Sequence, residues 1–250
     1  MLKRLFILAL LAFIALPSEA QYMRRKLKKR TAEACVYGNL GYYGNPHWGG
    51  GANIHYLHGI GRKKQWLSVG MGIRANVFST KKREYTTSSA RLTALNPGGA
   101  DSLYMAEVQT NSLNAYAAIK IHIKRGVDFF FNMDIGGLNF GDSKTGIFHS
   151  YETNPIPSTY VKYKSEPYAF NLNTLNSDSY GTLMGEAYGS FRLNPVLKWR
   201  LGFNFLRNEY KIDRNVPMNG KRFYQNHWMV MTGLGFDLRW KKNKAQELLW

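Results

Sequence analysis

Hydrophobic and polar residues alternate along most of this chain, which is the pattern of β-strands with two unlike faces. The clearest example runs from Trp66 to Phe78. Its odd-numbered residues from Leu67 to Val77 are apolar, and its even-numbered residues from Ser68 to Asn76 are small or polar. This segment is therefore predicted to be a strand that presents one apolar face.

Eight segments of the chain show this alternation, and an even number of strands can close into an all-antiparallel ring. The well-defined segments are longer than the roughly 9–11 residues that a tilted strand needs to cross a membrane. The two earliest segments are rich in glycine. The predicted strands are 32–43, 48–58, 66–78, 112–124, 127–140, 182–193, 196–208 and 223–240.

Short and long connections alternate between these segments. Short turns lie at 59–65, 125–126 and 194–195, and long segments lie at 79–111, 141–181 and 209–222. Only the first hairpin, at 44–47, departs from this rule. Short turns on one rim and long loops on the other are typical of outer-membrane barrels, whose short turns face the periplasm. Both ends of the barrel are therefore predicted to lie on the periplasmic side.

The bulk of the apolar faces indicates which way they point. They carry large residues such as Phe129, Trp199 and Phe203, whereas the polar faces are rich in Gly, Ser and Asn. An eight-stranded barrel is only just wide enough to be filled by side chains, so the bulky face is predicted to point outward into lipid. A soluble barrel with its apolar face inward is the alternative. Aromatic residues near the strand ends are predicted to form interfacial girdles: Tyr42, Tyr43, Trp48, Trp66, Phe78, Phe140, Phe223, Tyr224 and Trp240.

The first residues have the features of a secretory signal. Lys3 and Arg4 precede an apolar run that ends at Leu16, which is too short for the roughly 20 residues of a spanning helix. A retained membrane anchor is the alternative. Cys35 is the only cysteine, so no internal disulfide is possible, and it is predicted to lie in the wall of the first strand. The predicted organisation is a signal peptide at 1–20, a basic periplasmic segment at 21–31, the barrel at 32–240 and a periplasmic tail at 241–250.

The last predicted strand ends in the sequence Gly-Phe-Asp-Leu-Arg-Trp, from Gly235 to Trp240. This ending is similar to the terminal-strand signal that barrel-assembly machinery recognises, although here the chain continues to Trp250. From residue 32 to residue 240 the chain resembles the small outer-membrane β-barrels, which are OmpA/OmpX-like proteins and their relatives in Bacteroidota. The resemblance implies an all-β, eight-stranded, antiparallel, up-and-down transmembrane β-barrel in the cell outer membrane. It carries over no functional residue.

Charged residues recur on the predicted inward faces. In so narrow a lumen, a charge is costly unless a partner of opposite sign lies beside it. We expect an ion-pair network that plugs the lumen, and the alternative is a small selective channel. The residues of the predicted network are Arg74, Lys120, Asp128, Asp134, Glu186, Arg192, Lys198, Arg200, Asp237 and Arg239.

The formal net charge is +18, and most of the excess falls on the predicted periplasmic rim. Anionic phospholipid headgroups attract such residues, and an acidic periplasmic protein is the other candidate partner. Outer-membrane lipids, including lipopolysaccharide, are expected around the barrel, whereas nucleic acid is not an expected partner for an exported protein. The predicted basic patch comprises Arg24, Arg25, Lys26, Lys28, Lys29, Arg30, Arg62, Lys63 and Lys64.

The histidines do not form a motif of metal ligands, and no cofactor is expected. His149 and Ser150 are neighbours in a loop, where adjacent side chains point apart and cannot form a nucleophile–base pair by themselves. The predicted function is therefore non-enzymatic: a plugged barrel with a structural or docking role in the cell envelope. An outer-membrane enzyme that acts on the acyl chains of lipid A, or a small channel, remains as the alternative.

Overall fold

The computed structural model describes residues 30–61, 66–87, 101–124, 126–149, 161–174, 179–213 and 222–238. Within these ranges the chain forms eleven β-strands. No helix of the described residues is long and apolar enough to cross a membrane. The predicted signal peptide, nearly all of the basic segment and the predicted tail lie outside the described residues.

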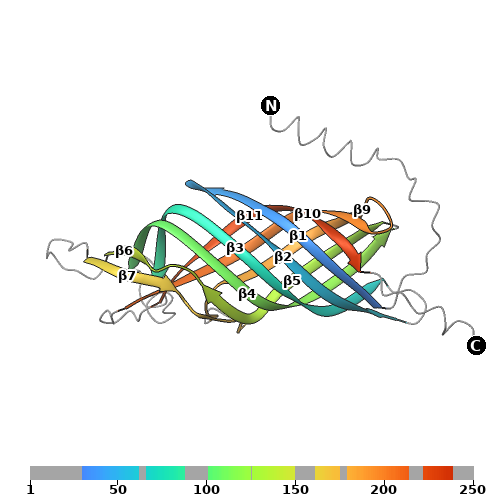
Figure 1. Ribbon diagram of the computed structural model, residues 1–250, viewed down its shortest axis with the longest axis horizontal. Coiled ribbons are helices and arrows are strands. Elements are labelled where there is room, and N and C mark those ends of the chain that lie inside the picture. The colour runs from blue at the N-terminus through green and yellow to red at the C-terminus, as the bar shows by residue number, and fades with distance from the viewer. Residues whose placement is uncertain are drawn as a thin grey trace, which may run out of the picture.

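Eight strands pair in the closed order β1–β2–β3–β4–β5–β9–β10–β11, and β11 pairs back to β1 (Figure 1). All of these pairs are antiparallel, as predicted. The strands are β1 (Arg30–Tyr43), β2 (Asn45–Ile60), β3 (Leu67–Thr87), β4 (Ser102–Lys124), β5 (Val127–Phe140), β6 (Lys144–His149), β7 (Val161–Pro167), β8 (Phe170–Leu172), β9 (Leu183–Arg192), β10 (Leu197–Ile212) and β11 (Arg222–Leu238).

The long connections contain structure that the alternation did not predict. The segment 141–181 was predicted to be a loop, but it carries β6, β7 and β8. Strands β3 and β4 also continue well past their predicted ends. The β6–β7 hairpin projects at the left of Figure 1, at the end opposite to the turn between β9 and β10.

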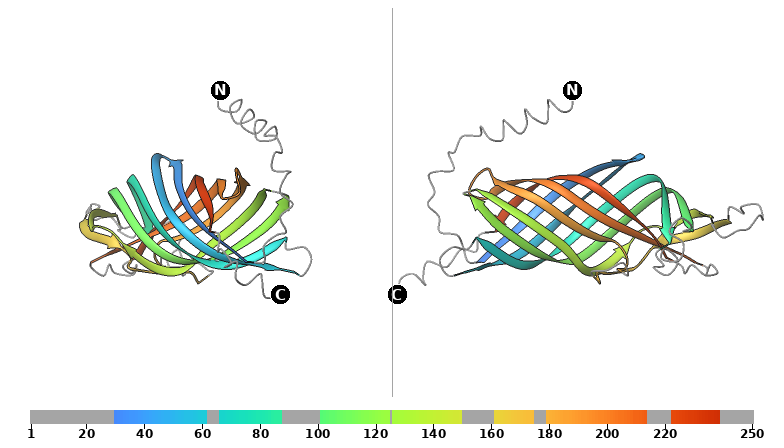
Figure 2. Two further views of the ribbon diagram at one scale, coloured as in Figure 1. Left: turned by 45° about the vertical axis from the view of Figure 1, so that its right-hand side comes forward. Right: turned by 180° about the vertical axis from the view of Figure 1, so that it is seen from behind.

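The barrel narrows at this projecting end, because four of its strands (β1, β2, β5 and β9) do not reach it and only β6 and β7 take their place. The β1–β2 hairpin turns at Gly44, and beyond it β3 pairs directly with β11 through Thr86 and Thr87. Strand β6 pairs with β4 and β7, and β7 pairs with β10. The right-hand view of Figure 2 shows the yellow β6–β7 hairpin at this end of the barrel. Together, these pairs make the outer end a second closed ring of six strands, β3–β4–β6–β7–β10–β11. We call this part the six-stranded cap.

A change in the backbone of β3 marks the start of the six-stranded cap. Lys82 has a positive φ of 49°, and β3 leaves its partner β2 just before it, after Thr80. The Arg83 guanidinium donates to the carbonyl oxygen of Asn45 at 2.6 Å, and the Asn45 amide donates to the carbonyl oxygen of Lys82 at 3.2 Å. These bonds fasten the tip of the β1–β2 hairpin to the strand that continues past it.

The outward face of the eight-stranded ring is apolar and exposed. Its exposed residues include Met71, Ile119, Phe131, Phe203 and Trp228. Exposing large apolar side chains to water costs free energy, so a continuous exposed band of this kind belongs in lipid.

The predicted girdles are confirmed at some positions and wrong at others. Tyr42, Trp48, Trp66 and Phe140 are exposed at the two ends of the apolar band. Phe78 and Phe223 are instead buried inside the barrel. Side chains of a strand alternate between the two faces, so Phe78 points inward because its neighbour Val77 points outward. Trp240 lies outside the described residues.

Glycines of the inward face make room for the large side chains of the lumen. Gly202 lies directly opposite Tyr188, and Gly72 lies directly opposite Tyr116. A Cβ atom at Gly202 would come within 2.5 Å of the Cβ of Tyr188, and one at Gly72 within 2.5 Å of the Tyr116 ring. Only glycine allows so close an approach of a neighbouring side chain.

We predict that Gly202→Ala destabilises the barrel by about 1–3 kcal/mol, because the added methyl group overpacks the lumen. Gly38→Ala is the matched control, since a Cβ atom at Gly38 would meet nothing within 4 Å. The thermal stability of both variants is measured as the temperature above which the compact, folded form no longer appears on an unboiled gel. Equal temperatures for the two variants would show that Tyr188 does not pack against Gly202.

Candidate functional site

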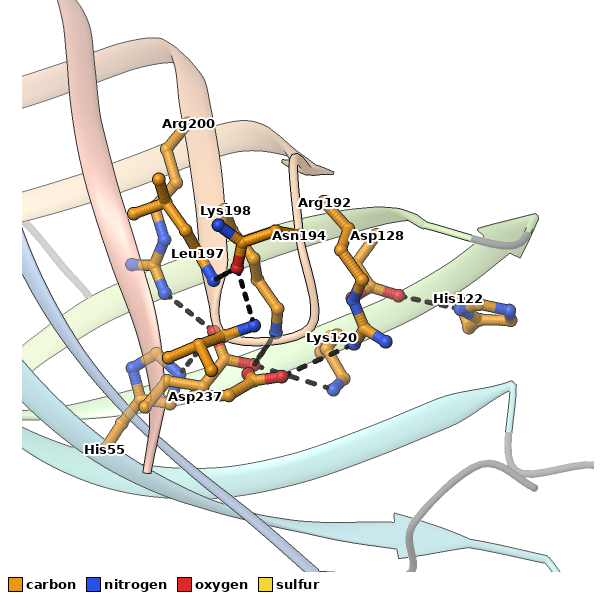
Figure 3. Close-up of polar contacts among 12 residues, drawn as sticks. His55, Lys120, His122, Asp128, Arg192, Asn194, Leu197, Lys198, Arg200 and Asp237 are labelled. Atoms are coloured by element: carbon orange, nitrogen blue, oxygen red, sulfur yellow. Dashed lines mark hydrogen bonds and ion pairs between the residues drawn. The ribbon is translucent and has the colours of Figure 1, made fainter. Parts of the chain in front are cut away.

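The turn between β9 and β10 places three cations in the lumen, at the end of the barrel that carries the short turns. The Asn194 side chain accepts hydrogen bonds from the backbone N–H groups of Val196 (2.9 Å) and Leu197 (2.8 Å), which fixes the turn. Lys198 then lies directly opposite Arg192, and Arg200 follows it two residues along β10. These side chains enter the lumen together (Figure 3).

Glu33 of β1 is the centre of the charged cluster at this end. Its carboxylate is fully buried and lies 2.5 Å from Lys198 Nζ and 2.9 Å from Arg200 Nη2. Lys120 and His55 approach the same carboxylate at 3.9 Å each. The cluster thus joins β1 to β2, β4 and β10 across the lumen.

Asp237 of β11 is the second acid of this cluster. Its carboxylate lies 2.7 Å from Lys198 Nζ and 3.5 Å from the Arg192 guanidinium. Lys198 therefore contacts two carboxylates, those of Glu33 and Asp237. Beside them, nearer the rim, Asp128 accepts a hydrogen bond from His122 at 2.7 Å (Figure 3).

A second cluster lies deeper in the lumen around Arg74 of β3. The guanidinium lies 3.2 Å from Glu186 and 3.6 Å from Asp134, although β4 and β5 separate β3 from β9 in the wall. Asn114 donates to Asp134 at 2.7 Å, and the backbone N–H of Met184 donates to it at 2.8 Å. Side chains from four strands, β3, β4, β5 and β9, therefore meet in the middle of the barrel, as its narrow interior requires.

Aromatic rings fill the space between the two clusters. Phe130 and Tyr188 stack with centroids 4.9 Å apart, and the Arg200 guanidinium lies 5.3 Å and 4.9 Å from their centres. Arg74 lies 4.6 Å from the centre of the Tyr116 ring. Cation–π contacts of this kind add attraction where water is excluded.

A layer of neutral hydrogen bonds follows towards the six-stranded cap. The Asn208 amide donates to Tyr85 and to Thr110, and its oxygen accepts from Thr182. Burial raises the pKa of Tyr85 well above its ordinary value and that of Tyr210 to about 12. Both phenols therefore stay neutral over the whole physiological pH range.

The six-stranded cap encloses an apolar core. Leu103, Met105, Ile212 and Phe223 are at most 1% exposed. Phe148 of β6 and Phe223 of β11 come from opposite walls of the cap, and their ring centroids are only 6.0 Å apart. Side chains of this cap therefore meet across its full width.

An ion pair fastens the segment that precedes β9 to the outside of the six-stranded cap. The Arg222 guanidinium donates to the buried carboxylate of Glu209, which also accepts from the backbone N–H of Gly181 at 2.8 Å. Arg222 also lies 3.9 Å from the centre of the Tyr180 ring. Burial alone would lower the pKa of Arg222, but Glu209 raises it above its ordinary value.

The structure brings together most of the residues of the predicted network, although its pairing was not predictable. Glu186 contacts Arg74, not the neighbouring cations Arg192, Lys198 and Arg200. Five cations and five carboxylates lie in or beside these clusters, but Asp128 contacts His122 and none of the five cations. The cations are Arg74, Lys120, Arg192, Lys198 and Arg200, and the carboxylates are Glu33, Asp128, Asp134, Glu186 and Asp237.

Glu33 is the functional residue that the sequence pattern did not reveal. It lies in the glycine-rich first strand, where the alternation of Glu33, Cys35 and Tyr37 with outward neighbours was the available signal. Arg239 lies outside the described residues, and so does the predicted basic patch except Arg30, which is exposed.

Two of the described histidines, His47 and His55, have ordinary structural partners. His47 contacts the Arg83 guanidinium at 2.8 Å and the carbonyl oxygen of Trp228 at 3.2 Å. His55 contacts the Tyr116 hydroxyl at 3.0 Å. Among the described residues, no group of three or more His, Cys, Asp or Glu side chains could hold a metal ion.

No protein-family model and no curated protein matches the chain. Solved structures of small barrels are similar to it over most of their length. Neisserial surface protein A is 10% identical, with 84% of this chain and 98% of that chain covered and a TM-score of 0.36. The attachment invasion locus protein of Yersinia pestis is 11% identical, with 85% and 100% covered and a TM-score of 0.33. A major outer membrane protein of Thermus thermophilus is 12% identical, with 83% and 99% covered and a TM-score of 0.36.

TM-scores and identities this low support no argument, so the class of protein is defined by the chain's own strands. The closed antiparallel ring and its exposed apolar band define a small transmembrane β-barrel, and barrels of this kind are proteins of the outer membrane. The narrower likeness to Bacteroidota relatives stays a prediction.

We predict that Arg74→Met destabilises the barrel by about 3–5 kcal/mol, because it leaves two buried carboxylates without their shared cation. The matched control is Lys211→Met, which breaks the exposed pair with Glu166 and should cost about 0–1 kcal/mol. Urea unfolding followed by tryptophan fluorescence measures both. Similar losses for the two variants would contradict the placement of Arg74 at the centre of the lumen.

Proposed function

We propose that this protein is a non-conducting, non-enzymatic barrel with a structural or docking role in the cell envelope. The observation that carries the proposal is the contact of Phe148 and Phe223 across the six-stranded cap. Apolar side chains from opposite walls leave no continuous polar path there for an ion or a solute.

The charged clusters support the same conclusion at the other end of the lumen. Arg74 and Glu186 reach one another across the bore, and Lys198 contacts the carboxylates of both Glu33 and Asp237. A conducting pore keeps such groups hydrated and apart, whereas here they are buried against each other. The barrel is therefore better suited to present its two rims than to pass material between them.

We predict no stepwise conductance when the purified protein is inserted into planar lipid bilayers. Lys120→Met removes a charge at the mouth of the lumen, and it should be equally silent because it leaves the six-stranded cap intact. Steps of defined size, with an ion selectivity that Lys120→Met alters, would instead establish the small channel.

The docking role is assigned to the short-turn rim. Exposed cations of this rim include Arg30 and Lys124, and the sequence adds the basic segment 21–31 and Arg62 to Lys64. Blocks of like charge stay extended and solvated until they meet an opposite charge. The candidate partners are anionic lipid headgroups of the inner leaflet and an acidic periplasmic protein.

We predict that replacing Arg24, Arg25, Lys28 and Lys29 with Gln leaves insertion intact but lowers the recovery of envelope partners in mild detergent. Recovery by the unaltered protein should also fall as salt rises, since exposed charges are screened beyond about 8 Å at physiological ionic strength.

The matched control replaces four exposed cations of the other end, Lys81, Lys82, Lys162 and Lys164, with Gln. This control should recover the same partners as the unaltered protein. If both quadruple variants behave alike, the basic rim has no special role in docking.

A further inference from the structure

The strand pairing that closes the barrel brings two acids face to face. Glu33 of the first strand and Asp237 of the last strand are direct partners in the β1–β11 register. Side chains at directly opposite positions of an antiparallel pair lie about 4.5–5.5 Å apart at Cβ, and like charges there are destabilising. Both carboxylates point into the lumen, where that of Glu33 is fully buried and that of Asp237 is 22% exposed.

A single side chain bridges these two acids. Lys198 Nζ lies 2.5 Å from Glu33 Oε1 and 2.7 Å from Asp237 Oδ1. Lys198 itself is only 3% exposed, so its ammonium group depends on the two carboxylates for its stabilisation. The flanking cations each serve only one of the acids: Arg200 contacts Glu33, and Arg192 contacts Asp237.

All three cations come from one hairpin. Arg192 ends β9, Lys198 and Arg200 lie near the start of β10, and Asn194 fixes the turn between them. The hairpin is local in sequence, whereas Glu33 and Asp237 come from the two ends of the barrel. The β9–β10 hairpin can therefore present its cations before the first and last strands meet.

We propose that Lys198 is an electrostatic clamp that holds the closing seam of the barrel, where β1 pairs with β11. The clamp makes closure conditional, because the two acids repel one another until the β9–β10 hairpin is in place. This inference is independent of the non-conducting role, since a barrel could be closed by the same clamp whether or not it conducted.

Substitution of Lys198 by Met tests the clamp, because Met keeps most of the length and the apolar stem. Lys120→Met is the matched control: Lys120 also approaches Glu33, at 3.9 Å, but it belongs to β4 and does not bridge the seam. We expect Lys198→Met to lower the temperature at which the compact gel form is lost, and Lys120→Met to lower it far less.

Removing the repulsion between Glu33 and Asp237 should restore the thermal stability that Lys198 provides. Adding Asp237→Asn to Lys198→Met should raise the temperature at which the compact gel form is lost most of the way back to that of the unaltered protein. Adding it to Lys120→Met should not raise this temperature. If Lys198→Met yields no compact form at all, the test is whether Lys198→Met with Glu33→Gln and Asp237→Asn folds. A triple variant that stays unfolded, or a double variant without recovery, would overturn the proposal.

Hydrogen–deuterium exchange locates the effect within the barrel. In Lys198→Met we expect peptides of β1 and β11 to exchange about tenfold faster or more, the change that a loss of about 1.4 kcal/mol produces. Peptides of β4 and β5, the pair that lies opposite the seam in the ring, should exchange as in the unaltered protein. Faster exchange spread evenly over all strands would mean that Lys198 stabilises the lumen in general and not the seam.

Discussion

The width of an eight-stranded lumen is the constraint on which the rest of this structure depends. Such a ring has room for side chains and little else, so each inward group must fit against its neighbours. Large rings lie over glycines, as Tyr188 does over Gly202. Charges pair directly across the bore, as Arg74 does with Glu186. The same constraint explains why breaking one ion pair is costly, since the remaining buried charge is neither paired nor hydrated.

The polarity of the interior falls from one end of the barrel to the other. Charged clusters occupy the short-turn end, neutral hydrogen bonds around Asn208 follow, and an apolar core around Phe223 fills the six-stranded cap. The cap can be apolar inside because it stands beyond the outward apolar band, where its outer surface meets water. It therefore packs as a small soluble barrel does, with its apolar side chains inward.

Most of the fold could be predicted from the sequence, because the period-two pattern is long and regular in the membrane strands. Strand β5 has the predicted bounds, and all eight ring strands were found. The short strands β6 and β8 carry too few residues for alternation to be recognised. The lumen residues were predictable from strand parity, but their partners were not. A contact such as Arg74 with Glu186 depends on the stagger of the strands around the ring, which no single segment encodes.

Cys35 offers the most direct test of a filled lumen. It is the only cysteine of the chain, it is 2% exposed, and its register partners Asn53 and Gly235 line the lumen with it. The folded protein in lipid should be treated with a small, charged, water-soluble thiol reagent, and labelling should be followed by mass spectrometry. A filled lumen predicts that Cys35 stays unlabelled until the barrel is unfolded and is then labelled completely. Labelling of the folded barrel as fast as of the unfolded chain would show that water reaches the middle of the lumen, and it would contradict this account.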